Sequence, residues 1–307
     1  MVVEKASRGK TKGAPRAPEQ PDEPVEQRFP DFLCIGVQKA GTTWLYRNLR
    51  RHPGIWLPPV KELQYFNALH IPHNRKWAAN SRRKHGIEVL KYYLDHTTAE
   101  KRNYHYIARI AEILDGQISD DWYGRIFSLA KPEQICGEIT PEYSKLPREG
   151  IEHVLRLMPK VKIILSLRDP IERNWSHIRM HAKKSGGNDL SKLEQLACTP
   201  GIMRRADYSV IIANWRALVS DDRLLITFMD DIITEPMQVL EKVCAFLGTD
   251  FSPKYFLQAD NPVHVGEPME IPPQIYALLK KQLKPAYDGI VELYPQIGEA
   301  WRSRHYV

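Results

Sequence analysis

Long apolar runs are missing from this 307-residue chain. No stretch approaches the roughly 18 consecutive apolar residues that a membrane-spanning helix needs, and the N-terminus lacks the apolar segment of a secretory signal. We therefore predict no membrane span and a cytoplasmic location. Cysteine is also scarce, because the four residues Cys34, Cys136, Cys198 and Cys244 lie far apart and three of them stand in apolar runs. This spacing argues against a disulfide framework or a zinc site.

Acidic residues are too few to balance the basic ones, with 44 Lys and Arg against 37 Asp and Glu and a formal charge of +7. A basic chain attracts anionic partners, and the charge alone leaves nucleic acid, a membrane surface and anionic small ligands open. Residues 1–29 are rich in charge, proline and glycine without apolar periodicity, so we expect a disordered tail there. Residues 30–307 suffice for a single domain with one large core.

Apolar strands alternate with amphipathic helices along the rest of the chain. Each unit of strand, helix and strand in this order is typical of a right-handed crossover between parallel strands. The sequence therefore predicts an α/β fold with a central parallel sheet flanked by helices. Strands are expected at 32–35, 134–143, 161–167 and 223–229, and helices at 42–51, 149–158, from 170 onward, 206–219 and 235–247.

The segment GVQKAGTTW follows the first expected strand directly. Gly36 and Gly41 have the spacing of the two glycines of a phosphate-binding P-loop, and a threonine stands where that motif has Ser or Thr. The lysine is displaced, because Thr42 follows the second glycine and Lys39 lies inside the loop. Backbone N–H groups at a helix N-terminus form a cradle for anions, so we predict a phosphate or a similar group here, on a P-loop-like sheet.

A second anion site is predicted after the strand at 161–167. This strand ends at Arg168, whose guanidinium is a fixed planar donor suited to phosphate oxygens. Asp169 is the best candidate for the metal-binding aspartate of an ATPase, but Arg168 separates it from the strand. Ser176 lies about two turns into the next helix, roughly 12 Å along its axis. An arginine at the end of the strand favours a second phosphate site over a magnesium site.

These segments resemble the sulfotransferases that use 3′-phosphoadenosine 5′-phosphosulfate (PAPS), in particular their bacterial and heparan-sulfate-type branch. QKAGTTWL resembles the 5′-phosphosulfate loop of that family, and RDPIERNWS resembles its 3′-phosphate motif. Further segments follow in the family's order: VKELQYF, GEITPEY, DDWYGRIF, RLLITFMDDIITEP and CAFLG. The resemblance covers residues 31–300 and implies one sulfotransferase domain. It also implies sulfuryl transfer from PAPS, without a metal, to a hydroxyl or amine of a small-molecule or glycan acceptor.

The resemblance implies a catalytic role for two residues. Lys39 is expected to stabilise the charge that develops on the oxygen leaving the sulfuryl group. Glu62 matches the family's catalytic glutamate and is expected to take the acceptor's proton, helped by apolar neighbours that raise its basicity. A role for Glu62 at a helix N-terminus stays open, as do His70 and His73 as competing bases. Glu138 is a further carboxylate near the same edge of the sheet, with an ion-pair or loop-holding role as the alternative.

Other residues are implied to bind the nucleotide. Backbone and hydroxyl donors of the loop would hold the 5′-phosphosulfate, and the arginine and serine of the second motif would hold the 3′-phosphate. NPVHVGEPMEIPP stands where the family has a basic, glycine-containing loop that closes over PAPS, and it departs from that loop by having Glu267 where a cation is expected. For Trp44 and Tyr208, ordinary core packing is an equal alternative. The full set is Lys39, Ala40, Gly41, Thr42, Thr43, Trp44, Arg168, Ser176, Tyr208, His264 and Gly266.

Two other functions remain open. One is a small-molecule or nucleoside kinase that uses ATP and Mg²⁺, with Asp169 as the metal ligand. The other is a basic nucleic-acid-binding protein that uses residues 1–16 and 75–102, although no nucleic-acid-binding module is recognisable. We expect residues 70–120 to form a helical insertion on the acceptor side, with its basic face mostly in solvent. The sequence predicts neither the identity of the acceptor nor the oligomeric state.

Overall fold

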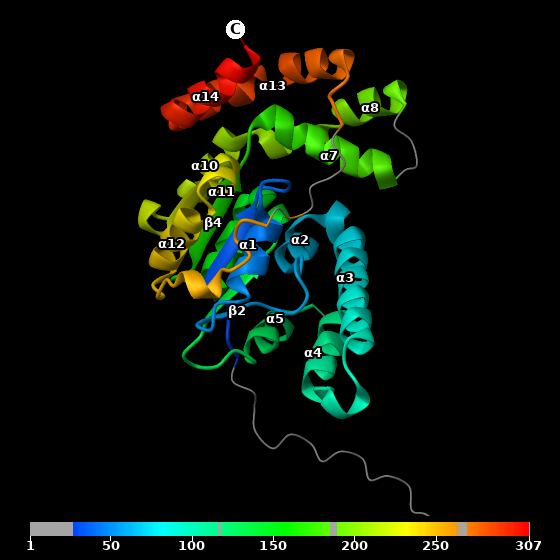
Figure 1. Cartoon of the computed structure of the whole chain (residues 1–307), viewed down its shortest axis with the longest axis vertical. Coiled ribbons are helices and arrows are strands. Elements are labelled where there is room, and N and C mark those ends of the chain that lie inside the picture. The colour runs from blue at the N-terminus through cyan, green and yellow to red at the C-terminus, as the bar shows by residue number, and fades with distance from the viewer. Residues whose placement is uncertain (1–26, 116–117, 185–188, 262, 264–268, 307) are drawn as a thin grey trace, which may run out of the picture.

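A five-stranded parallel sheet lies at the centre of the computed structural model, which describes residues 27–115, 118–184, 189–261, 263 and 269–306. The strand order is β2-β3-β1-β4-β5 (Figure 1). The strands are β1 (Phe32–Gly36), β2 (Ile55–Trp56), β3 (Ile135–Ile139), β4 (Lys162–Leu167) and β5 (Leu224–Phe228). After β1 the chain builds β2 and β3 on one side and β4 and β5 on the other. The carboxyl ends of β1 and β4 therefore meet where open α/β sheets bind ligands.

Helices cover both faces of the sheet, and the alternation of side chains along β1 decides which core each residue joins. Phe32 and Cys34 pack in one core with α1 (Thr42–Leu49) and α12 (Pro236–Leu247). Leu33 and Ile35 belong to the larger core on the other face. Helices contributing to that core are α2 (Tyr65–His70), α4 (Tyr104–Asp115), α5 (Asp120–Phe127), α6 (Arg148–Leu157), α7 (Pro170–Lys184), α8 (Leu190–Ala197), α9 (Pro200–Met203), α10 (Tyr208–Arg216), α13 (Pro273–Leu293) and α14 (Pro295–His305). All of β1 is buried, as expected for a strand covered on both faces.

The long helix α3 (Arg75–Asp95) packs against α4 beside the sheet (Figure 1). Gly86 allows the close approach, since a Cβ there would lie 2.4 Å from Leu114 Cδ2. Most basic side chains of α3 are exposed, but Arg82 is only 3% exposed. Its guanidinium lies over the Trp122 ring at 4.9 Å and donates to the Ile113 carbonyl. For Arg82 the expectation of a solvated basic face is therefore wrong.

The predicted α/β class and its alternation of elements are confirmed, and the differences concern the ends of elements, one short strand and the last residues of the expected tail. The first helix ends at Leu49, two residues earlier than expected. Strand β2 was not predicted, because two residues carry no periodicity. Residues 27–29, expected in the tail, pack on the domain, with Arg28 donating to the Lys131 carbonyl at 2.7 Å and the Phe29 ring 6.3 Å from that of Tyr123. Among the described residues, none of the helices combines the length and apolarity needed to cross a membrane.

Candidate active site

The loop between β1 and α1 has a backbone that demands glycine at two positions. Gly36 has a φ of 144° and Gly41 a φ of 85°. A Cβ on Gly36 would lie 2.7 Å from the Pro141 carbonyl oxygen, and a Cβ on Gly41 would lie 2.7 Å from Ile232 Cδ1. Lys39 also has a positive φ, 76°, which side-chain-bearing residues adopt at a cost. The loop is therefore a tight turn that presents a lysine from its middle.

The first turn of α1 fits an anion. Its N-cap residue is Gly41, and no side chain caps the helix there. Uncapped N–H groups together with the positive end of the helix dipole favour a negatively charged group at this point. Thr42 and Thr43 add hydroxyl groups at the same turn, and both line the cavity described below.

Arg168 follows β4 directly and lies beside the loop. Its Nη1 donates to the Lys39 carbonyl at 3.3 Å, and its Nη2 pairs with Glu172 at 3.2 Å, one turn along α7. The Tyr208 hydroxyl donates to the Arg168 carbonyl at 2.5 Å, so α10 fixes the backbone there. The ends of two neighbouring strands thus bring two cationic residues together, and Ser176 lines the same cavity.

Further cations surround Lys39. Burial lowers the pKa of Lys39, and the positive charges of Arg168, Arg179 and Arg173 lower it further. Arg173 is fully buried and donates its Nε–H to the Gln38 carbonyl at 3.1 Å. It therefore supports the loop from the side opposite the cavity. This concentration of positive charge suits a ligand with more than one negative charge.

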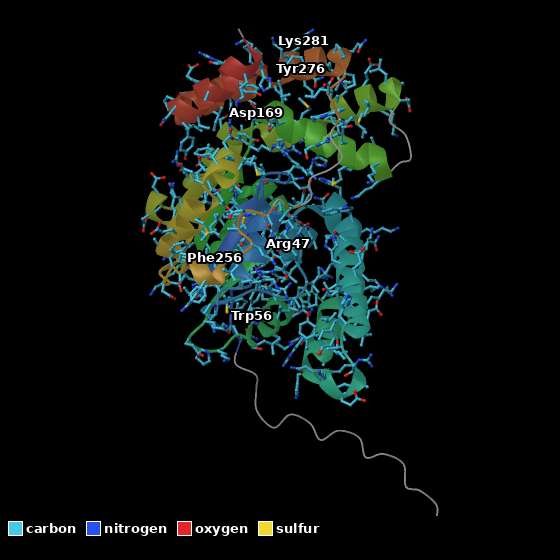
Figure 2. The ribbon with its side chains drawn as sticks, viewed as in Figure 1. Arg47, Trp56, Asp169, Phe256, Tyr276 and Lys281 are labelled. Carbon is cyan, nitrogen blue, oxygen red and sulfur yellow. The ribbon has the colours of Figure 1, made fainter. Side chains whose placement is uncertain are left out.

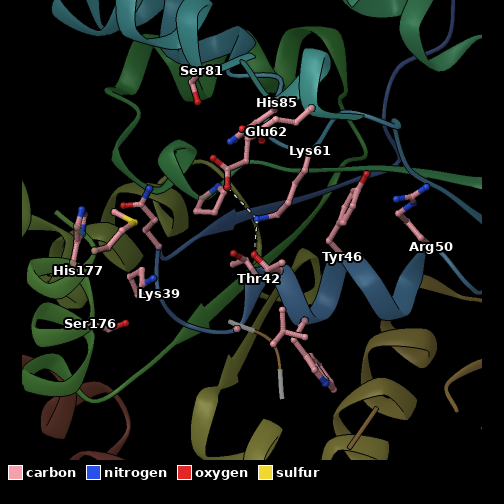
Figure 3. A pocket seen from close by; sticks show the side chains of 18 of the residues that line it. Lys39, Thr42, Tyr46, Arg50, Lys61, Glu62, Ser81, His85, Ser176 and His177 are labelled. Carbon is pink, nitrogen blue, oxygen red and sulfur yellow. Dashed lines mark hydrogen bonds and ion pairs between the residues drawn. The ribbon is translucent and has the colours of Figure 1, made fainter. Parts of the chain in front are cut away.

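A cavity of about 2340 Å³ opens over these residues (Figure 3). It is larger than the roughly 300–1,000 Å³ of an ordinary small-molecule site, so it has room for two reactants. Among the described residues that line it, nine are Lys or Arg and four are Asp or Glu, so this part of the lining is basic. The basic residues are Lys39, Arg50, Lys61, Lys84, Arg168, Arg179, Lys183, Lys184 and Arg205, and the acidic ones are Glu62, Glu88, Asp260 and Glu270.

Glu62 lies in the turn between β2 and α2, on the wall of the same cavity. It has a φ of 64°, and α2 begins only at Tyr65, so Glu62 does not occupy a helix N-terminus. The neighbouring Lys61 places its Nζ 3.0 Å from Glu62 Oε1 and 3.2 Å from Thr43 Oγ1. This lysine connects the candidate base to the first turn of α1.

Glu138 is buried near the turn that carries Glu62, and it does not line the cavity. Its carboxylate accepts hydrogen bonds from the hydroxyl groups of Tyr123, Tyr143 and Thr140 at 2.5, 3.0 and 2.5 Å. Burial raises the pKa of Glu138 to about 7, although the three hydroxyl donors act in the opposite direction. The Tyr143 oxygen also accepts the backbone N–H of Tyr65 at 2.9 Å. This network anchors the start of α2.

Asp169 has both carboxylate oxygens engaged by protein groups. Its Oδ1 accepts the backbone N–H groups of Ile171 and Glu172 at 2.9 and 3.1 Å and the Tyr287 hydroxyl at 2.8 Å. Its Oδ2 lies 3.1 Å from His305 Nε2. Asp169 therefore caps the start of α7 and ties it to α13 and α14. Figure 2 labels Asp169 on the side of the sheet where these C-terminal helices lie. These contacts leave it poorly placed to bind the magnesium that the kinase alternative requires.

Comparison with known families shows which family the chain belongs to. Residues 30–253 match the model of the sulfotransferase family. The chain belongs to this family. Both loops predicted to bind anions, and Glu62, lie within the matched residues of this sulfotransferase-family chain.

Curated relatives share a limited part of their length with this member of the sulfotransferase family. The bifunctional heparan sulfate N-deacetylase/N-sulfotransferase 4 of Mus musculus is 28% identical over 246 residues, covering 72% of this chain and 22% of the relative. The membrane-associated sulfotransferase kil1 of Dictyostelium discoideum is 28% identical over 167 residues, covering 52% and 26%. Carbohydrate sulfotransferase 15 of Mus musculus is 24% identical, covering 72% and 44%. The chain thus spans less than half of each relative.

Solved structures agree with the fold. A sulfotransferase from Alicyclobacillus acidocaldarius superposes with a TM-score of 0.62 at 23% identity, covering 89% of this chain and 98% of that one. The mouse sulfotransferase SULT7A1, solved in complex with PAP, superposes with a TM-score of 0.50 at 14% identity, covering 91% and 89%. At these identities the likeness establishes the sulfotransferase fold for this chain.

Most of the site residues expected from the sequence meet at the cavity. Trp44 also belongs to the core, being 4% exposed with its indole N–H donated to the Ala259 carbonyl at 2.7 Å. Ala40 and Tyr208 are fully buried and do not line the cavity. The Ala40 carbonyl accepts the Ser166 hydroxyl at 2.5 Å. The expected site residues that line the cavity are Lys39, Gly41, Thr42, Thr43, Trp44, Glu62, Arg168 and Ser176.

The competing bases lie elsewhere. His70 and His73 are not among the described residues that line the cavity, and His70 Nε2 instead lies 2.7 Å from His153 Nδ1. His264 and Gly266, expected in the closing loop, lie outside the described residues.

The structure adds three residues to the site that the sequence did not identify. Lys61 had a signal, because it precedes Glu62 in VKEL. Arg173 and His177 are four residues apart and so share a face of α7, with a hydrogen bond between Arg173 Nη2 and His177 Nδ1. Burial and the adjacent Arg173 lower the pKa of His177 far below its ordinary value, so its ring is neutral. Nothing in the sequence says which face of α7 meets the loop.

Proposed function

We propose that this chain is a sulfotransferase that transfers the sulfuryl group of PAPS in line to a hydroxyl or amine of an acceptor. The observation that carries the proposal is the meeting of two strand ends at one basic cavity, where Arg168 contacts the carbonyl of Lys39. Membership of the sulfotransferase family supports it. So does the structural neighbour solved with PAP, which is the desulfated form of the same nucleotide.

Two groups of residues would hold the two charged ends of PAPS. The uncapped N–H groups of α1 and the hydroxyls of Thr42 and Thr43 are suited to the 5′-phosphosulfate. Arg168 and Ser176 are suited to the 3′-phosphate, because both face the cavity from the end of β4 and from α7. Tyr208 would act from behind by fixing the backbone of Arg168. The closing role expected for His264 and Gly266 stays a prediction.

The residues of the chain can perform the transfer as follows. Glu62 takes the proton of the acceptor while the acceptor's oxygen or nitrogen forms its bond to sulfur. The bond between sulfur and the bridging phosphate oxygen breaks, and its electron pair stays on that oxygen. Lys39 donates a hydrogen bond to the same oxygen and stabilises its developing charge. The chain thus supplies a base and a cation at the two ends of the reaction, and we assign no metal to the step.

The acceptor would lie along α3. Cavity-lining residues recur on one face of this helix from Trp77 to Tyr93, a length of roughly 24 Å at 1.5 Å per residue. An elongated polar molecule suits such a wall, and a glycan is consistent with the relatives named for heparan sulfate and carbohydrate. In this proposal, residues 70–120 are the acceptor-side insertion. The cytoplasmic location and the absence of a nucleic-acid partner stay predictions.

The test is a transfer assay with the full chain, PAPS and a panel of oligosaccharides, phenols, alcohols and amines in buffer containing EDTA. We expect at least one acceptor to gain the mass of one SO₃, and we expect Lys39→Met and Arg168→Met each to lower turnover by roughly 100-fold or more. Lys160→Met is the matched control, since this exposed lysine precedes the amino-terminal end of β4, whereas the cavity lies at the carboxyl ends of the strands. In a parallel assay with ATP and Mg²⁺ in place of PAPS, phosphoryl transfer that EDTA abolishes would instead establish the kinase alternative.

A further inference from the structure

Lys61 lies between the first turn of α1 and the proposed base (Figure 3). Its ammonium group contacts Glu62 Oε1 at 3.0 Å and Thr43 Oγ1 at 3.2 Å. The side chain is 16% exposed and lines the cavity. A cation in this position stands where the two reactants of the proposed transfer would meet.

The turn that carries this lysine is costly to form. Glu62 and Gln64 both have positive φ, 64° and 58°, a backbone conformation that is unfavourable for residues with a Cβ. Arg82 holds the turn by donating to the Leu63 carbonyl at 3.2 Å. A partly exposed Lys–Glu pair stabilises a protein too little to offset two residues in this conformation. The pair between Lys61 and Glu62 therefore does not explain why the turn is built.

The ammonium group has capacity for a ligand. It carries three N–H donors, and within the described part of the chain Thr43 and Glu62 account for its two hydrogen-bond partners. We propose that Lys61 is a second catalytic cation, which binds an oxygen of the sulfuryl group during transfer and orients Glu62 toward the acceptor. This inference rests on the proposed function.

The two lysines act on different oxygens. The new bond joins the acceptor atom to sulfur, the bond from sulfur to the bridging oxygen breaks, and the proton passes to Glu62. Lys39 stabilises the charge that remains on the bridging oxygen of the leaving nucleotide. Lys61 stabilises the charge on the oxygens that travel with sulfur to the product. Since PAP lacks the sulfuryl group, Lys61 has no role in binding PAP.

The experiment compares the full chain with Lys61→Met, Lys61→Arg and the control Lys160→Met. Methionine keeps the length and the apolar stem of lysine and removes the charge. PAP affinity is measured by calorimetry, turnover with PAPS by mass spectrometry at saturating acceptor, and folding by urea denaturation. We expect Lys61→Met to bind PAP within about twofold of the unchanged chain and to lose roughly 100-fold in kcat. Lys61→Arg should lose less, because it keeps the charge.

Two results would overturn the inference while leaving the proposed function intact. One is a Lys61→Met variant whose kcat stays within about threefold of the unchanged chain, a loss too small for a catalytic cation. The other is a loss of PAP affinity as large as the loss of kcat, which would make Lys61 a nucleotide-binding residue. If the unchanged chain bound PAP and PAPS but transferred sulfuryl to none of the acceptors, or bound neither nucleotide, the proposed function would fail and this inference with it.

Discussion

Replacing Glu138 with glutamine is expected to remove most of the pH dependence that this one group gives to the stability of the fold. Glu138 is buried, and burial raises its pKa from the ordinary 4.5 to about 7. Between these two values the folded chain holds a proton on Glu138 that the unfolded chain has released. The free energy of unfolding must therefore fall as the pH rises through this window, and it levels off above about pH 7.

The magnitude follows from the size of the shift. One pKa unit corresponds to about 1.4 kcal/mol, so the full shift of Glu138 corresponds to about 3 kcal/mol of stability. Measured between pH 5 and 8, roughly 2–3 kcal/mol of that should be visible. Glutamine stays neutral at every pH, and the hydroxyls of Tyr123, Tyr143 and Thr140 can accept as well as donate, so they can still bond to the amide.

The assay is urea denaturation of both proteins at several pH values between 5 and 8. Other titrating groups occur in both chains, so the difference between the two unfolding free energies isolates Glu138. We expect the glutamate form to lose about 2–3 kcal/mol relative to Glu138→Gln as the pH rises. If the two curves ran parallel within about 1 kcal/mol, a pKa near 7 for this buried carboxyl would be ruled out.

Two further predictions concern Lys39 in the cavity and Asp169 at the start of α7. Because the pKa of Lys39 is lowered, a larger fraction of its amine is neutral at about pH 8 than for an ordinary lysine. We expect an acylating reagent to modify it before Lys160 and expect PAP to protect it, and peptide mass mapping would contradict this if both lysines reacted equally. Asp169→Asn should lower the free energy of unfolding by about 1–3 kcal/mol, by weakening its contact with His305. It should leave PAPS-dependent turnover of the folded protein within a few-fold in EDTA, whereas complete loss of turnover would point to a direct role in the chemistry.

The sequence predicted those parts of the site that are encoded by neighbouring residues. Gly36 and Gly41 satisfy a local turn, and Arg168 ends a strand whose apolar run is visible in the sequence. Since β1 and β4 are adjacent and parallel, the two loops had to meet once both strands were recognised. The expectation for Lys39 depended on the same local pattern.

Contacts between distant segments decided the rest. Tyr208 donates its hydroxyl to the carbonyl of Arg168, 40 positions away, and is fully buried without lining the cavity. Arg82 is buried because the Leu63 and Ile113 carbonyls come within reach of its guanidinium. Neither contact has a sequence signal, because helical periodicity specifies which residues share a face and not what that face meets.

The charges around Lys39 link the stability of the loop to its proposed ligand. Arg168 and Arg173 donate to carbonyl groups of Lys39 and Gln38, so the loop is held by the same cations that lower the pKa of Lys39. Glu172 offsets part of this charge by pairing with Arg168. The remaining repulsion favours the binding of an anion, and a nucleotide with charged groups at both ends would relieve it at two points at once. Cations that are already in place stabilise the charge of the transition state efficiently, because the protein does not have to reorganise when the bond breaks.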